Sequence, residues 1–367
     1  MPDVETHYLV GEDAEGAACV APCFTFKVSL VTMAGPRMQR IVSSVRNVFP
    51  NFLQLRVFVV GSPISNCGDL LGLGTGERAA RWDSVRLAGL FDEITRRAYS
   101  LTIGLVLIKE PDTALTDRLR PALAERFFFA ESLPTTYLAI PDLAKGGYLG
   151  AICSRYRNKL RKRKSVGEQN HLTWEISPTC RGQEDAVFDL YRQVLENSAF
   201  VFERLNREFF PQVERLLGDR MFFLFGYRQV DGVRKLVACE LVLIDRDTLH
   251  PLYSGFDYWV KKDSSLYFNA FYRIIEEAEK RGIHRVDFGQ TAYEVKAELG
   301  AVCTPLFVGV HHRNRVLHAL LRALRSWIFP PSVFPAREVF GNEPMPSKNG
   351  RPVKNTVRPT PSNTLLQ

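Results

Sequence analysis

The order of predicted strands and helices in the C-terminal half constrains the fold of this chain more than any other feature. Hydrophobic periodicity predicts a strand, two helices, three antiparallel strands, a helix and two further strands, over residues 172–176, 184–195, 207–217, 221–228, 236–245, 248–254, 266–281, 284–288 and 306–310. The Asp231-Gly232 pair between the first two antiparallel strands is a strong hairpin signal. Because strands alternate with helices, we expect an α/β fold built of helix and sheet layers.

The N-terminal half repeats this alternation. Its pattern predicts strands at 7–10, 17–20, 53–61, 101–109, 127–129 and 137–140, with helices at 82–99 and 116–125. Two similar halves indicate two units, at 1–145 and 146–312. An amphipathic helix at 313–329 follows, and then a tail at 330–367 that is rich in Pro, Asn, Ser and Lys and is expected to be disordered.

Composition excludes several classes of protein. The chain has 367 residues, and its 46% hydrophobic content is enough for two cores. It contains no apolar run of about 18 residues that would predict a transmembrane helix, and its acidic N-terminus lacks the basic segment of a secretory signal. Seven scattered cysteines without C-x-x-C spacing are typical of reduced thiols, so we expect a cytoplasmic protein without a metal site or a tightly bound cofactor.

A basic segment without acids begins the second half. Residues 143–167 contain eight Lys and Arg residues and no Asp or Glu, and the spacing of apolar residues predicts one helix over 148–164 with Leu149 on its apolar face. Its cations predict binding of an anionic small-molecule donor or precursor, or of tRNA, through Lys159, Arg161 and Lys162. A solvated helix face is the alternative. The absence of a DNA-recognition motif argues against DNA as a partner.

Polar residues follow the ends of two predicted strands that flank one helix. Tyr253 and Ser254 end the first strand, and a Gly-Gln-Thr sequence follows the second, so we predict a polar ligand pocket between them that is lined also by Gln290, Thr291 and Tyr293. Turn and capping chemistry would explain the last three equally. Asp257 and Glu240 are the candidate general bases. Glu240 lies within an apolar strand, where burial would raise its pKa, although an ion pair or an edge position would also explain it.

Five sequence motifs carry a resemblance to a known family. They are S-R-Y-R-N-K-L-R-K-R-K at 154–164, F-F-P-Q-V-E-R-L-L-G at 209–218, Y-S-G-F-D-Y at 253–258, L-Y-F-N-A-F-Y-R-I-I-E-E-A-E-K-R-G at 266–282 and F-G-Q-T-A-Y-E-V-K-A-E-L-G-A at 288–301. Together they resemble the FemAB-like branch of the GNAT superfamily, and more narrowly its BioF2-like acetyltransferase group. The resemblance covers residues 8–310 and is specific from Tyr148 onward.

The resemblance implies a fold of tandem GNAT-like units with mixed sheets. It also implies an acyltransferase, because Fem members transfer an amino acid from aminoacyl-tRNA to a peptidoglycan precursor and related members acylate amines or sugars. The expected function is transfer of an acetyl or aminoacyl group from a thioester or aminoacyl-tRNA to an amine or hydroxyl, in cell-envelope or polysaccharide metabolism. Lys296 matches the family lysine thought to stabilise phosphate or developing negative charge; an exposed helix lysine is the alternative.

One departure from the family pattern keeps a second function open. GNAT enzymes that use acetyl-CoA usually carry [Q/R]-x-x-G-x-[G/A], a loop that binds pyrophosphate. The nearest match, from Gln229 to Arg234, fails at its last position and lies in a predicted hairpin turn. Acyl-CoA therefore remains a candidate co-substrate only. The alternative function is a non-catalytic GNAT-fold module that recognises an anion.

The helix at 314–328 has apolar residues on one side and Arg315, His318, Arg322 and Arg325 on the other. This pattern predicts an interfacial helix that gives the protein a peripheral contact with the inner face of the membrane. A helix docked on its own domain would show the same pattern.

Overall fold

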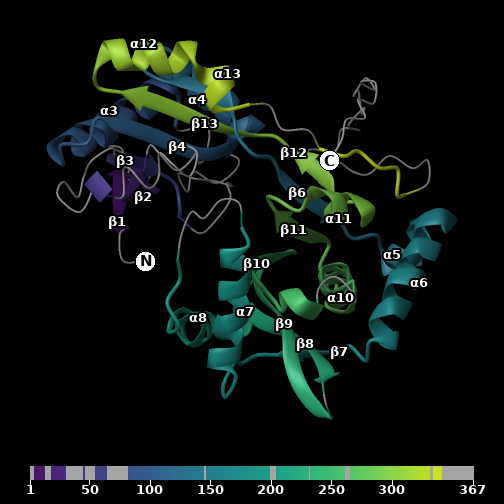
Figure 1. The fold of residues 1–367 in the computed structure, drawn as a ribbon. Coiled ribbons are helices and arrows are strands. Elements are labelled where there is room, and N and C mark those ends of the chain that lie inside the picture. The colour runs from purple at the N-terminus through teal and green to yellow at the C-terminus, as the bar shows by residue number, and fades with distance from the viewer. Residues whose placement is uncertain are drawn as a thin grey trace.

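The computed structural model describes residues 4–12, 18–29, 44–45, 54–63, 82–143, 146–198, 204–230, 232–260, 265–330 and 334–340. The described residues form two mixed β-sheets with helices packed on their faces, which confirms the expected α/β class (Figure 1). Each element predicted from 172 to 310 is present with boundaries shifted by a few residues, and the structure adds a helix, α11 (Tyr293–Glu298), and a strand, β12 (Val302–Thr304), between the last two predicted strands.

Sheet A has six strands among the described residues, in the order β1-β2-β3-β4-β13-β5. Their bounds are Glu5–Glu12, Ala18–Ser29, Gln54–Val60, Leu105–Asp112, Leu306–His312 and Phe128–Glu131. On one face, helices α3 (Ser84–Ser100) and α4 (Thr113–Leu123) share a core with the sheet that includes Phe58 and Phe91. On the other face the core receives Leu321 and Phe329 from the C-terminal helical segment.

Sheet B has seven strands in the described part of the chain, in the order β12-β6-β11-β10-β9-β8-β7. Their bounds are Val302–Thr304, Thr135–Ala139, Arg285–Gly289, Thr248–Phe256, Val233–Asp245, Met221–Val230 and Thr173–Ser177. One face packs against α10 (Leu266–Lys280), and the other against α7 (Glu184–Glu196) and α8 (Phe209–Leu217). Cover on both faces explains why β8 is apolar from Met221 to Tyr227, and β9 from Leu236 to Ile244 except at Glu240.

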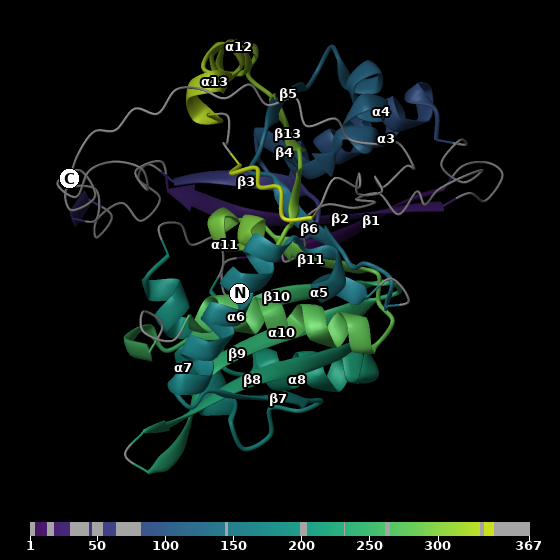
Figure 2. The ribbon, with the colours of Figure 1, turned by 90° about the vertical axis from the view of Figure 1, so that its right-hand side faces the viewer.

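Each half of the sequence supplies a strand to the sheet of the other half. β6 comes from the first half and pairs in sheet B with β11 and β12, while β13 comes from the second half and pairs in sheet A with β4 and β5. The chain crosses between the sheets at 132–134 and returns at Pro305, and the Ser132 N–H donates to the Leu306 carbonyl at 2.8 Å. Figure 2 shows the two sheets one above the other, with these crossings between them.

The helix predicted over 148–164 is broken in the structure. It consists of α5 (Gly147–Ala151) and α6 (Ser154–Gln169), because Ile152 is extended and forms a bridge with Phe340, while the Cys153 N–H donates to the Val339 carbonyl at 2.9 Å. Leu149 is exposed, so the predicted single apolar face is wrong at that position.

The predicted strand at 101–109 begins four residues later than expected. Thr102 has a φ of 60°, and the turn it forms closes α3 before β4 starts at Leu105. Near the other end of the chain, residues 334–340 belong to the segment expected to be disordered, yet Val339 is buried in the core of the second half. The rest of the expected tail, 331–333 and 341–367, lies outside the described residues.

Candidate active site

The two strand ends predicted to flank a pocket do separate in sheet B. β10 and β11 are parallel but pair only at Thr248↔Arg285 and Leu249↔Val286. Beyond these pairs β10 continues beside β9, with a bulge between Pro251 and Tyr253, and β11 continues beside β6. The backbones therefore part at the level of Tyr253 and Asp287, in the centre of a sheet where parallel strands would otherwise remain bonded.

Glu240 lies next to this parting, on the interior strand β9. Its side chain is fully buried, and the Ser254 hydroxyl from the neighbouring position on β10 donates to Oε2 at 2.8 Å. Oε1 has no hydrogen-bond partner among the described residues. Burial raises the pKa of the Glu240 carboxyl to about 8, against smaller lowering effects of the Ser254 hydrogen bond and the Lys296 charge. The geometry therefore places the Glu240 carboxyl in the interior, as its position within an apolar strand predicts.

Lys296 lies on the short helix α11 (Tyr293–Glu298) and is fully buried, so it is not the exposed helix lysine of the alternative interpretation. Its ammonium donates to the carbonyls of Phe288 at 2.6 Å, Gly289 at 3.2 Å and Gln290 at 2.6 Å. Burial lowers its pKa to about 7, while the charges of Asp287 and Glu240 act in the opposite direction. Lys296 thus holds the end of β11 and acts electrostatically on Glu240.

The segment between β11 and α11 has a constrained backbone. Thr291 and Ala292 have φ values of 63° and 48°, a conformation that costs free energy in residues other than glycine. Gln290 fixes the segment, since its amide donates to Glu110 Oε1 at 2.8 Å and to the Leu133 carbonyl at 2.7 Å. The Tyr293 hydroxyl donates to the Pro134 carbonyl at 2.9 Å.

These contacts come from the first half of the chain, and sequence reasoning missed Glu110. It lies at a bulge of β4 with a φ of 54°, and nothing in its local sequence marks it as a partner of residue 290. Gln290 and Tyr293 thus hold the segment in place with groups that a ligand would otherwise use, and the Thr291 side chain is exposed.

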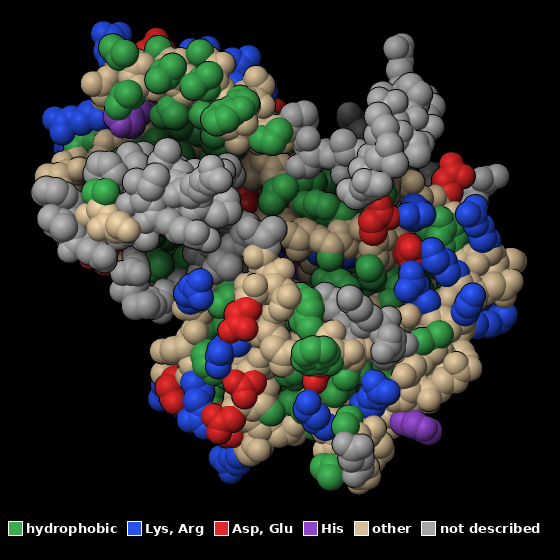
Figure 3. Space-filling view, viewed as in Figure 1, with side chains coloured by type: hydrophobic (Ala, Val, Ile, Leu, Met, Phe, Trp, Pro, Cys, Tyr) green, Lys and Arg blue, Asp and Glu red, His purple; other side chains and the backbone are tan. Residues whose placement is uncertain are grey.

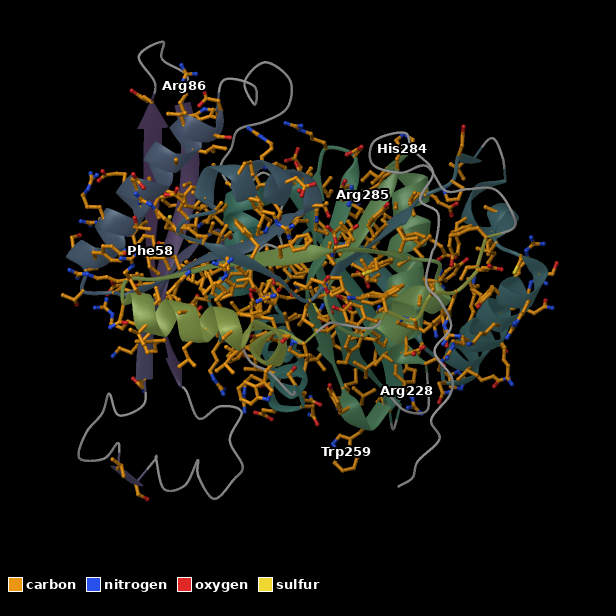
Figure 4. The ribbon with its side chains drawn as sticks, turned by 90° about the horizontal axis from the view of Figure 1, so that it is seen from above. Phe58, Arg86, Arg228, Trp259, His284 and Arg285 are labelled. Carbon is orange, nitrogen blue, oxygen red and sulfur yellow. The ribbon has the colours of Figure 1, made fainter. Side chains whose placement is uncertain are left out.

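Asp257 and Tyr253 have partners of other kinds. Asp257 is buried, accepts from the Lys235 ammonium at 3.0 Å and caps the backbone N–H of Trp259 at 3.0 Å. Trp259 itself projects into solvent at the rim of sheet B (Figure 4). The Tyr253 ring packs edge-on against Tyr191 and Phe209 on the side of α7 and α8.

The basic segment lies beside the candidate site, because ion pairs join α6 to the end of α11. Glu298, two residues after Lys296, accepts from Lys159 at 2.7 Å and from Arg163 at 3.0 Å. Lys164 also lies 3.8 Å from Glu276 on α10, so three cations of the basic segment have acidic partners elsewhere in the chain. Arg161 and Lys162 are exposed and form no ion pair within the described residues, and Arg161 donates only to the Asn158 side chain.

The interior between the strand ends is closed in this state. Glu240 and Lys296 have no contact with solvent, whereas a hollow of about 270 Å³ lies elsewhere, lined by β7 and α10 residues such as Trp174 and Arg273. A substrate therefore reaches Glu240 only when neighbouring groups move. No group of three or more potential metal-ligating side chains occurs among the residues that the structure describes.

Comparison with known proteins assigns this region. Residues 154–297 match the family described as the acetyltransferase (GNAT) domain. The chain also resembles the solved structure of FemX, with a TM-score of 0.55 at 12% identity over 87% of this chain and 91% of FemX. The structure of L-PGS from Bacillus licheniformis has a TM-score of 0.51, at 12% identity over 86% of this chain and 88% of that one.

These likenesses span both sheets, so the fold around the GNAT domain is shared along almost the whole chain. The fold expected from the resemblance to FemAB-like proteins is thereby confirmed, since FemX is among the solved structures that share it. A sequence comparison with curated proteins gave no match. No helix in the described ranges is long and apolar enough to cross a membrane.

Proposed function

We propose that this protein is an acyltransferase that moves an acetyl or aminoacyl group from a thioester or an aminoacyl-tRNA to an amine or hydroxyl acceptor. The observation that carries the proposal is Glu240, a buried carboxyl with one unpartnered oxygen, beside the parting of β10 and β11 in a GNAT domain. A carboxyl held nearly neutral at neutral pH is suited to take up one proton and release it again.

The proposed reaction needs one base and one source of positive charge. The acceptor nitrogen or oxygen attacks the donor carbonyl carbon, and its proton passes to the Glu240 carboxylate. The bond from carbon to the thiol sulfur or tRNA ribose oxygen then breaks, and the proton returns from Glu240 to the leaving group. Ser254, which donates to Oε2, orients the carboxyl so that Oε1 is free for this transfer.

Lys296 supplies the positive charge in this proposal. Its N–H groups are all directed to backbone carbonyls, so it acts on the developing oxyanion through its charge and through the position of the β11 end. A charge is more effective in a closed site than in water. Asp257, tied to Lys235, is the second candidate base, and Tyr253 and Ser254 bound the acceptor side.

The decisive experiment is a mass-spectrometric search for product with acyl-CoAs and aminoacyl-tRNAs over a panel of amines and sugars. With an active pair, Glu240→Gln is expected to lower turnover roughly 100-fold or more, the range typical of a lost general base. Glu277→Gln is the matched control, since Glu277 is also buried but pairs with Arg281 on α10. Equal turnover in both variants would assign the proton transfer elsewhere, with Asp257→Asn tested next.

The exposed cations of α6 are proposed to bind the phosphates of the donor. Arg161→Gln combined with Lys162→Gln should raise the KM for the donor and flatten its dependence on salt, because fewer phosphate contacts release fewer counterions. Lys159→Gln should have a smaller effect, since Glu298 already neutralises Lys159. An unchanged salt slope in the double variant would make the helix a solvated surface only.

The second candidate function is a non-catalytic module that recognises an anion. It is favoured by the hairpin position of the 229–234 sequence, where Gln229 pairs with Arg234 in β8 and β9 and no helix N-terminus is presented. Under this alternative the wild-type protein would bind CoA or tRNA with the salt dependence described above and give no product with any donor.

A further inference from the structure

The C-terminal helical segment presents an apolar face to solvent. α12 (Arg315–Ala323) and α13 (Arg325–Ile328) lie on sheet A, on the face opposite α3 and α4. Val316 is 76% exposed, Leu320 52% and Trp327 80%, and Leu317 and Leu324 are also exposed. Figure 3 shows hydrophobic side chains gathered on the surface over α12 and α13. We call these five residues the α12 face.

The face is held in a fixed orientation by contacts on its other side. Leu321 and Phe329 pack into the core of sheet A. The Asn314 side chain caps the helix by accepting from the Val316 and Leu317 backbone N–H groups, and the His318 ring packs against Phe128. Val316, Leu320 and Leu324 are four residues apart, so they form a row along the helix that turns away from these contacts. The helix is thus docked on its own domain by one side and unpartnered, within the described structure, on the other.

The charge around the α12 face has a single sign. Residues 299–337 contain no Asp or Glu and five arginines. Arg315, Arg322 and Arg325 lie on the two helices, and none of them forms an ion pair within the part of the chain that the structure describes. An apolar helix face that ends in an exposed Trp and is bordered only by arginines is complementary to a surface that is apolar beneath a layer of negative charge.

We propose that the α12 face binds the surface of an anionic lipid bilayer, with the helix lying parallel to it. The sign of the charge argues against the other occupants. A second copy seated on the same face by twofold symmetry would bring two sets of these arginines together without an acid between them. The chain from 341 to 367 has one acid, Glu343, and four Lys or Arg residues, so it carries the same charge as the border of the face.

The test uses the full-length protein and sedimentation with vesicles of phosphatidylcholine, with and without 30% phosphatidylglycerol. We expect binding to the anionic vesicles that weakens as salt is raised. The combined change Val316→Ser, Leu320→Ser and Trp327→Ser should weaken this binding at least tenfold, because the apolar side chains would no longer enter the interface. Replacing the three arginines with Gln should weaken it about fivefold per residue and remove the preference for phosphatidylglycerol.

The matched control is Val85→Ser with Trp259→Ser, which removes a valine and a tryptophan that are 80% and 91% exposed on other surfaces. It should bind the anionic vesicles as the wild type does, and unchanged far-UV circular dichroism would show that all variants are folded. Three results would each overturn the proposal: no binding by the wild type, equal binding by the apolar variant, or a wild-type dimer in analytical ultracentrifugation that the apolar variant dissociates. None of these readouts depends on acyl transfer.

Discussion

Glu240 and Lys296 are two ionisable side chains in one dry region, and burial acts on them in opposite directions. It raises the pKa of Glu240 to about 8 and lowers that of Lys296 to about 7. The stability that depends on a neutral Glu240 is complete below the ordinary glutamate pKa of 4.5 and is lost as pH rises through about 8. The stability that depends on a neutral Lys296 is complete above the ordinary lysine pKa of 10.5 and is lost as pH falls through about 7. Between pH 7 and 8 the two slopes oppose each other, so the pair changes charge there with little net effect on stability.

The rate of acyl transfer is expected to follow the titration of Glu240. With an active donor, kcat/KM should have a rising limb as Glu240 ionises and a falling limb as Lys296 loses its charge, with a maximum between about pH 7 and 8, because only the carboxylate accepts a proton and only the ammonium carries the positive charge. Lys296→Met should lower turnover roughly 100-fold and move the rising limb to higher pH, since the lysine charge lowers the pKa of Glu240. If Lys296→Met acted only by disturbing the structure, the rate would fall but the rising limb of the pH profile would stay at the same pH. A rising limb below pH 6 in the wild-type protein would contradict the assignment of Glu240.

The local sequence was enough to predict several candidate site residues, but it predicted none of their long-range contacts. Glu240 stands out because it interrupts an apolar strand, and Lys296 stands out through the motif around it. The sequence did not predict that Lys296 is buried. Its ammonium is satisfied in the interior by three backbone carbonyls at the end of β11, and a side-chain pattern does not reveal backbone acceptors. Glu110 has no local signal, since its partner is 180 residues away and its own conformation depends on a bulge against β13.

Elements show the same division between local and long-range causes. The hairpin of β8 and β9 and the periodic helices α3, α7 and α10 form where the pattern predicts, because their own residues supply both the period and the turn. The break between α5 and α6 was not predictable from the basic segment. It depends on Val339 and Phe340, which lie in a stretch whose composition is typical of disorder.

The Gly289–Ala292 segment offers a test of this long-range control. Gln290→Ala removes two hydrogen bonds that tie the segment to Glu110 and Leu133, each worth about 1 kcal/mol. Amide hydrogen exchange at 289–292 should therefore accelerate roughly tenfold or more, and turnover should fall with it. Gln169→Ala is the control, because that exposed side chain contacts only Ser165 on its own helix. Unchanged exchange in Gln290→Ala would mean that α11 alone fixes the segment.

At the scale of the whole molecule, the two sheets are joined by exchanged strands as well as by hydrogen bonds such as that from Gln290 to Glu110. β13 completes sheet A between β4 and β5, and β6 completes sheet B between β11 and β12. The sequence suggests a boundary between two units at 145/146, where one half of the pattern ends and the other begins. That boundary does not separate the sheets, because each sheet contains a strand from the other side of it. The site depends on this arrangement, since Thr135 on β6 donates to Asp287 at 2.9 Å beside the parting of the strands.

The exchange predicts that the halves fold only together. Residues 146–367 alone lack β6 and leave the facing edges of β11 and β12 unpaired, while residues 1–145 alone lack β13 and leave β4 and β5 separated. Buried backbone groups without partners are costly, so each fragment is expected to be unfolded or aggregated on its own. Produced together, the fragments should associate, and the intact chain should unfold in one transition that is the same by fluorescence and by circular dichroism. A cooperative transition of isolated 146–367 at the melting temperature of the intact chain would show instead that the GNAT domain needs neither β6 nor sheet A.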